Sequence, residues 1–208
     1  MRNYIEFLTN KNTKKAGAMG TILDIIKNRR TIKPSFFSEE TLADNDVKEM
    51  LEAANWAPTH KFTEPWRFVV FSKNAKNQFG IDHANMYKEV KSEQDFDQDN
   101  YDKLMTIAAK ASHIIAIIMK RDEEERVPEI EEIAAVACAV QNMMLLATEK
   151  EIAHIWSSGG LTYNSKMKNY LGFSEKDRVL GFLYLGKSEQ KPKSKRFSSA
   201  EAKTVWKE

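Results

Sequence analysis

The chain has 208 residues, of which 42% are apolar and 10% aromatic, and its 32 Lys+Arg and 30 Asp+Glu leave a formal net charge of +2. This length suits one large domain or two small ones, and the composition excludes a disordered chain. The near-zero charge argues against a dedicated nucleic-acid-binding protein. A single cysteine excludes an internal disulfide and favours a reduced, cytoplasmic location. No uncharged apolar run is long enough to predict a membrane span, and the basic amino terminus lacks a signal-peptide core.

The first third of the chain predicts two helices. Thr21–Arg30 places its isoleucines on one face, as a short amphipathic helix does. Ser38–Trp56 has apolar residues at helical spacing, and Asp44 or Asn45 could cap its main part. This helix must end before Pro58, because proline disfavours helical geometry in the residue that precedes it.

The middle of the chain predicts two strands with helices between them. Residues 66–71 are aromatic and β-branched, and His113–Lys120 is a continuous apolar run that predicts a buried central strand. Residues 75–111 have a helical pattern with an acidic break around Asp95–Asn100. The residues leave two interpretations of this break open, a solvated loop or a mobile lid over a site.

A long apolar helix dominates the last third. Pro128 suits its first turn, and the helix continues to Lys150 with apolar residues almost all round. Because such a helix has no wet face, we expect it to pack against both a sheet and a second subunit. A short helix from Asn164 to Gly172 and a last strand over Val179–Leu185 complete the predicted elements.

Charge is unevenly distributed along the chain. Residues 1–33 carry eight Lys/Arg and two acids, and the last 22 residues carry seven Lys/Arg and three acids. The compensating acids lie in Lys88–Lys103 and Lys120–Glu132. Two interpretations remain open: solvated helix faces and flexible ends, or a positive patch near residue 30 that binds a small anion.

Conventional catalytic patterns are missing. The sequence has neither a Gly-x-Gly-x-x-Gly motif nor a phosphate-binding P-loop, and its four histidines lack metal-ligand spacing. We expect His113 to be a satisfied histidine at the edge of the core and Cys138 to be a buried structural thiol. No metal site and no catalytic residue of the protein itself is predicted, so an enzyme of this sequence would rely on a cofactor.

Three segments are suited to holding such a cofactor. Lys27–Lys33 combines guanidinium, hydroxyl and ammonium groups that can bind a phosphate. Trp56–Trp66 is a loop bracketed by prolines that carries aromatic and hydrogen-bonding groups. Ile155–Thr162 contains two glycines that would let backbone N–H groups approach a ligand.

The order RRTIK, APTHKFTEPWRFVVF, HIWSSGGLT and VLGFLYLGK resembles the flavin-dependent nitroreductase family, above all its short NAD(P)H nitroreductase branch, over residues 20 to about 188. The resemblance implies an α+β fold, a three-layer α/β/α sandwich around a mostly antiparallel mixed sheet. It also implies an intertwined homodimer that exchanges chain ends and holds FMN at the subunit interface. Residues 20–208 would form one FMN-binding domain, and residues 1–19 an added helix, an exchanged arm or a tail.

The resemblance also assigns residues to the cofactor. The FMN-binding set comprises Arg29, Arg30, Thr31 and Lys33 in the first segment, Trp56, Pro58, Thr59 and His60 from the other subunit, and Trp156, Ser157 and Ser158 in the third. We expect Arg29 at the phosphate and Arg30 or Lys33 near the flavin N1/C2 carbonyl. Ser157 stands where the branch often has arginine, which removes one charge.

A further region is associated with the nicotinamide. It comprises Leu146, Ala147, Thr148, Glu149, Lys150 and Glu151, and the sequence lacks the glycine-rich turn that the family usually has there. The implied activity is FMN-dependent NAD(P)H oxidation by ping-pong hydride transfer to nitroaromatic, quinone or similar acceptors, with specificity set by His83–Lys103. The altered nicotinamide region leaves an alternative open, a flavin-binding storage or sensor protein without useful turnover.

Overall fold

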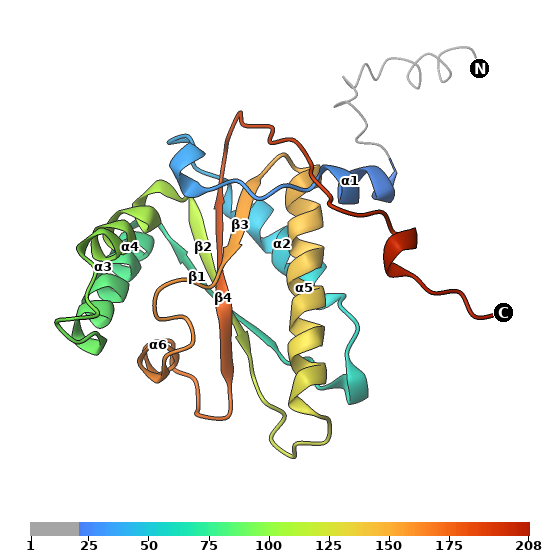
Figure 1. The fold of residues 1–208 in the computed structure, drawn as a ribbon. Coiled ribbons are helices and arrows are strands. Elements are labelled where there is room, and N and C mark those ends of the chain that lie inside the picture. Colours follow the sequence, from blue (N-terminus) through green and yellow to red (C-terminus); the bar gives the residue numbers. More distant parts are fainter. Residues whose placement is uncertain (1–20) are drawn as a thin grey trace, which may run out of the picture.

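A four-stranded sheet lies at the centre of the computed structural model, which describes residues 21–208 (Figure 1). Its strands are β1 (Trp66–Ser72), β2 (His113–Met119), β3 (Ala153–Ser157) and β4 (Arg178–Gly186). They are ordered β1-β2-β4-β3, and each neighbouring pair is antiparallel. The expected α+β class and layered sandwich are therefore confirmed, and the strands of the described residues form no parallel pair. The predicted amino-terminal extension, residues 1–19, lies outside the described residues.

Helices cover both faces of the sheet (Figure 1). One face carries α2 (Asp44–Asn55) and α5 (Glu129–Glu149), and the other carries α3 (Lys73–Val90), α4 (Gln98–Lys110) and α6 (Ser165–Tyr170). The first helix, α1 (Ile22–Asn28), contacts α5. Short 3-10 turns lie at Pro34–Phe36 (η2), His60–Phe62 (η3) and Glu201–Lys203 (η4).

The centre of the core is β2, whose seven residues are all buried. Ile115 and Ile117 face the α2/α5 layer, whereas Ile114 and Ile118 face the α3/α4 layer. A strand that is buried on both faces needs apolar residues at successive positions, so the pattern is continuous rather than alternating. The prediction of a buried central strand is confirmed.

The long helix α5 has one buried and one exposed face. Val136, Val140 and Met143 are fully buried against the sheet, while Ile130 is 69% exposed and Cys138 is also exposed. The prediction that Cys138 is a buried thiol is wrong for this chain, because the residue lies on the outward side of the helix. By length and composition α5 is also apolar enough to cross a membrane. Core helices meet the same criterion, and the buried face identifies α5 as a core helix.

The element boundaries show three further differences. Helix α2 begins at Asp44 rather than at Ser38, and the break between α3 and α4 spans residues 91–97. The Asp97 side chain caps α4 by accepting a hydrogen bond from the Asp99 N–H at 2.9 Å. Strand β3 was not predicted, because its segment was interpreted only as a ligand-binding loop.

Candidate functional site

The first predicted segment and β3 lie side by side in one chain. The Ile32 N–H donates to the His154 carbonyl at 3.0 Å, which fixes the segment after α1 along the outer edge of β3. The carboxyl-terminal segment reaches the same place, since the Arg30 Nε donates to the Pro192 carbonyl at 3.0 Å. Three parts of the chain that are far apart in sequence therefore meet at one end of the sheet (Figure 1).

Positive charge collects where these segments meet. Burial, helped by the charges of Arg30 and Arg196, lowers the pKa of the Arg29 guanidinium. In the described part of the chain none of these three arginines forms an ion pair with a carboxylate; Arg30 and Arg196 donate to backbone carbonyls. Thr31 and Lys33 are exposed beside them. Because these guanidinium groups form no ion pair with a carboxylate, the cluster is suited to binding an anion.

Arg196 is a residue that sequence reasoning missed. It belongs to the basic stretch Lys193–Arg196, which was interpreted as solvated surface. Its charge acts on Arg29, which is 167 positions away in a chain of 208 residues. The density of basic residues in that stretch was the available signal, but the sequence does not say where a tail packs.

A cavity of about 690 Å³ opens beside this cluster. Its wall is formed by the segment after α1, the end of α5, the start of β3 and the carboxyl-terminal segment. The charged side chains around it are Arg30, Glu40, Glu151, Lys187, Glu189 and Lys191. His154 also lines it, so a polar ring that is 2% exposed stands at the wall of a mixed-charge cavity.

The third predicted segment continues from this cavity along β3. The Trp156 Nε1 donates to the Leu180 carbonyl at 3.0 Å, which fixes the indole against β4. Ser157 is half-buried and pairs with Phe182, and Ser158 is exposed just after the strand. Two of the three predicted segments, the first and the third, are thus brought together by the fold of one chain.

The loop after β3 is held by His83. Its Nε2 accepts a hydrogen bond from the Leu161 N–H at 3.0 Å, and burial lowers the pKa of the imidazole to about 4. Gly160 has a φ of +65°, and a Cβ at this position would lie 2.4 Å from the His83 Nε2. Glycine is therefore required both for the backbone conformation and for the close approach of the histidine.

The second predicted segment lies elsewhere in the chain. Trp56 is 79% exposed and donates to Glu52 at 2.9 Å, and the His60 Nδ1 is 2.5 Å from a Glu131 carboxylate oxygen. Pro58 is exposed and Thr59 is half-buried in the same loop. Glu131 is in the first turn of α5, whereas Arg30 shares a cavity with Thr148 near its last turn. These positions are about 25 Å apart along the helix, at 1.5 Å per residue.

The predicted nicotinamide region is the end of α5. Leu146, Ala147, Thr148 and Glu149 are still helical, and Lys150 is the C-cap. The Lys150 ammonium lies 2.9 Å from Asp46 and 2.6 Å from Glu49, and these bonds raise its pKa. Thr148 and Glu151 line the cavity of His154, so this region borders the cationic cluster even though Lys150 is turned toward α2.

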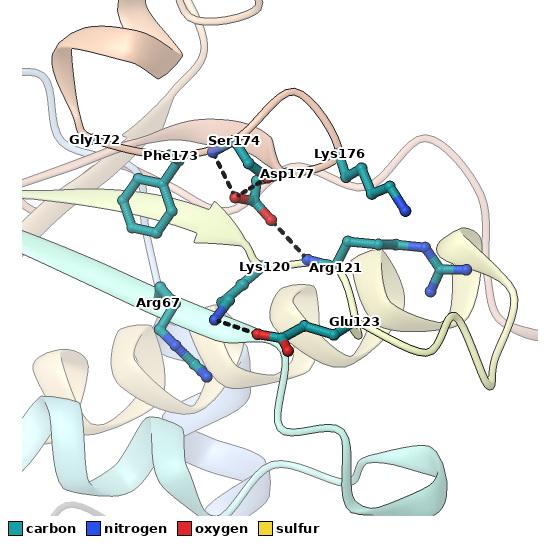
Figure 2. A pocket seen from close by; sticks show the side chains of 9 residues that line it. All are labelled: Arg67, Lys120, Arg121, Glu123, Gly172, Phe173, Ser174, Lys176 and Asp177. Carbon is teal, nitrogen blue, oxygen red and sulfur yellow. Dashed lines mark hydrogen bonds and ion pairs between the residues drawn. The ribbon is translucent and has the colours of Figure 1, made fainter.

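A second cavity, of about 540 Å³, lies at the opposite end of β4 (Figure 2). Asp177 stands at its wall and accepts hydrogen bonds from the Arg121 N–H at 2.9 Å and from Ser174 at 2.8 Å. The Arg121 side chain pairs with the buried Glu132, and Lys120 lies 3.5 Å from Glu123. None of the predicted site residues lines this cavity, so it is separate from the candidate site.

The remaining candidates for chemistry are a metal site and His113. Within residues 21–208, no group of three His, Cys, Asp or Glu side chains could hold a metal ion. His113 is 2% exposed; its Nδ1 lies 2.9 Å from the Ser112 hydroxyl and its Nε2 lies 3.1 Å from Asp44. This confirms the prediction of a satisfied histidine at the edge of the core.

Comparisons with known proteins agree on one family. A sequence profile described as "Nitroreductase family" matches residues 26–187. The Bacillus subtilis protein named "Putative NAD(P)H nitroreductase YfhC" is 27% identical over 184 residues, which cover 88% of this chain and 93% of the relative. The solved nitroreductase-like family protein from Bacillus cereus is 26% identical with a TM-score of 0.76, over 91% of this chain and 97% of that chain. A Desulfovibrio desulfuricans structure, described as a "putative nitroreductase in complex with fmn", is 23% identical with a TM-score of 0.68 and the same coverage.

Proposed function

Because the chain belongs to the nitroreductase family, we propose that it is an FMN-dependent NAD(P)H oxidoreductase that reduces nitroaromatic, quinone or similar oxidised acceptors. Bound FMN would supply the redox chemistry, which is hydride transfer from the nicotinamide and electron transfer to the acceptor. The protein's own residues bind and orient the cofactor. The name of the B. subtilis relative and the FMN in the D. desulfuricans structure support the proposed cofactors.

The observation that carries the proposal is the cluster of Arg29, Arg30 and Arg196. Three guanidinium groups that have no carboxylate partner in the described chain would form a binding site for a phosphate dianion. Their mutual repulsion is relieved when an anion binds between them, so the chain gains more from a phosphate than isolated surface arginines would.

The direction of β3 fits the rest of an FMN molecule. Ser157 lies three residues beyond His154, which corresponds to about 10 Å along a strand. A cofactor with its phosphate at the arginines and its chain along β3 would place its ring near Ser157 and Ser158. Trp156 is fixed against β4 and would hold this part of the strand rigid.

A second copy of the chain would complete the site. Trp56 and His60 lie at the amino-terminal end of α5 and the arginines near its carboxyl-terminal end. A two-fold axis perpendicular to the exposed face of α5 sets the two α5 helices antiparallel. The loop of Trp56 and His60 in one chain then approaches the arginines of the other. The exposed apolar residues Ile130 on α5, Ile22 on α1 and Trp206 in the carboxyl-terminal segment support burial in such a homodimer.

Titration of the flavin-free protein with FMN tests the cofactor site. We expect quenching of flavin fluorescence, and a loss of affinity of about 10- to 100-fold in Arg29→Gln, because a charge-assisted contact to the phosphate is removed. Arg67→Gln is the matched control, since Arg67 is an exposed arginine that donates only to backbone carbonyls at the far cavity. Equal affinities of the two variants, or no binding of FMN at all, would contradict the proposal.

Turnover separates the enzyme from the storage or sensor alternative. Oxidation of NADH or NADPH should depend on added nitrofurazone or a quinone, and initial rates should give the parallel double-reciprocal lines of ping-pong kinetics. A protein that holds FMN but oxidises neither nicotinamide would be a flavin-binding protein rather than an oxidoreductase.

A further inference from the structure

One buried side-chain polar atom of the described residues has no hydrogen-bond partner. It is the Nε2 of His154, a residue that is 2% exposed. Buried polar groups in folded proteins are nearly always paired, because an unpaired one keeps the cost of its desolvation. An unpaired atom at the wall of a cavity is therefore a candidate contact for a bound molecule.

The hydrogen bond on the other side of the ring determines the tautomer. The His154 Nδ1 lies 2.9 Å from the Ile152 carbonyl, which can only accept, so Nδ1 carries the hydrogen. In the neutral ring Nε2 is consequently a bare acceptor. Nε2 can donate to an anion only when the ring gains a second proton.

In the absence of a bound anion, the surroundings of the His154 ring disfavour its second proton. Burial lowers the pKa of the His154 imidazole and the Arg29 charge lowers it further, while the bond to Ile152 partly offsets them. The cavity wall adds Arg30, Lys187 and Lys191 as cations and Glu40, Glu151 and Glu189 as acids. A phosphate dianion would cancel the nearby guanidinium charge and offer Nε2 an acceptor.

We propose that His154 contacts the phosphate of the bound flavin through Nε2, and that its imidazole takes up one proton as the phosphate binds. The inference rests on the proposed FMN site and adds a residue to it. The proton comes from solvent and stays on Nε2, so His154 binds as a cation that supplements the arginines. The arginine that the resemblance leads one to expect at position 157 is replaced by serine. His154, three residues earlier, would supply a positive hydrogen-bond donor in its place.

The uptake of a proton makes the affinity for FMN depend on pH. A group that is protonated in the complex and neutral in the free protein makes binding weaker as the pH rises. The phosphate itself has a second pKa near 6, so it is already a dianion at about pH 7.5. It therefore releases few protons when it binds. At that pH we expect an uptake of about 0.5 to 1 proton per FMN, and close to zero for riboflavin, which lacks the phosphate.

Calorimetry on the unmodified protein measures this uptake directly. FMN and riboflavin are titrated at about pH 7.5 in two buffers of different ionisation enthalpy, neither of them phosphate, and the difference in heat gives the protons bound. Uptake with FMN and not with riboflavin is the expected result. No uptake with FMN, or equal uptake with both flavins, would overturn the inference.

A variant tests the contact itself. His154→Asn keeps an amide N–H where Nδ1 donates to Ile152 and removes Nε2. We expect it to bind FMN about 10- to 100-fold more weakly than the wild type near pH 6, with a smaller difference near pH 9 and no change for riboflavin. If FMN binds both proteins equally at every pH, His154 is not a phosphate contact and the proposed function stands. If FMN binds neither protein, the proposed function fails as well.

Discussion

At the scale of single residues, His83 holds the loop after β3 and makes the stability of the protein depend on pH. Its neutral Nε2 accepts the Leu161 N–H, and burial has lowered its pKa from an ordinary value near 6.5 to about 4. Between these two values the unfolded chain binds a proton and the folded chain does not. The histidine therefore has no effect on stability above about pH 6.5, and stability is lost as the pH falls from there toward 4.

We predict that the free energy of unfolding falls by roughly 2–3 kcal/mol between pH 7 and pH 4 because of this one residue. His83→Gln keeps an acceptor for the Leu161 N–H but does not titrate, so its unfolding energy should depend less steeply on pH in this range. Urea unfolding of both proteins at several pH values measures the difference. Parallel curves for the two proteins would show that His83 is not the titrating group.

At the scale of elements, α5 ends in a Schellman motif without glycine. The Ile152 N–H donates to the Ala147 carbonyl at 2.7 Å and the Glu151 N–H donates to Thr148 at 3.2 Å. This closure needs a left-handed residue, and Glu151 supplies it with a φ of +56°. The α6 helix closes in the same way, but its left-handed residue is Gly172, with a φ of +80°.

We predict that Glu151→Gly raises the free energy of unfolding by about 0.5–1 kcal/mol, because glycine adopts this conformation without steric cost. The reverse change at the matched position, Gly172→Ala, should lower it by a similar amount. Its added Cβ meets no atom within 4 Å, so the cost there comes from the backbone conformation alone. Thermal or urea unfolding measures both. A destabilised Glu151→Gly would mean that the glutamate makes a contact worth more than the strain.

Part of the fold escaped prediction even though the end of α5 was predicted to within one residue. The segment that follows it was interpreted only as a ligand-binding loop. β3 is also a five-residue edge strand with His154 and Ser157 in it, which is a weak pattern. Strands β1, β2 and β4 were predictable because their apolar residues are continuous or aromatic. Within the site, RRTIK was recognisable as a local motif, whereas Arg196 joins it only through tertiary packing.

At the scale of the whole molecule, the exposed face of α5 is the candidate interface of the proposed homodimer. This face carries the 69% exposed Ile130 and the exposed Ala134 and Cys138, and it lies between the two halves of the predicted site. In a single soluble chain this apolar stripe would face water. In the proposed homodimer it becomes part of the self-complementary contact, in which residue i of one helix contacts residue j of the other and j contacts i.

We predict that Ala134→Arg converts the dimer to a monomer, because each chain would bury a guanidinium group in the interface without a partner. FMN affinity should fall in parallel, since the loop of Trp56 and His60 would no longer reach the arginines of the second chain. Ala109→Arg is the matched control: Ala109 is also an exposed helical alanine, but it lies on α4 in the opposite layer. Light scattering gives the mass of each variant and fluorescence titration its FMN affinity. A monomeric wild type that binds FMN, or an Ala134→Arg dimer with unchanged affinity, would show that the α5 face is not the interface and that one chain suffices for the site.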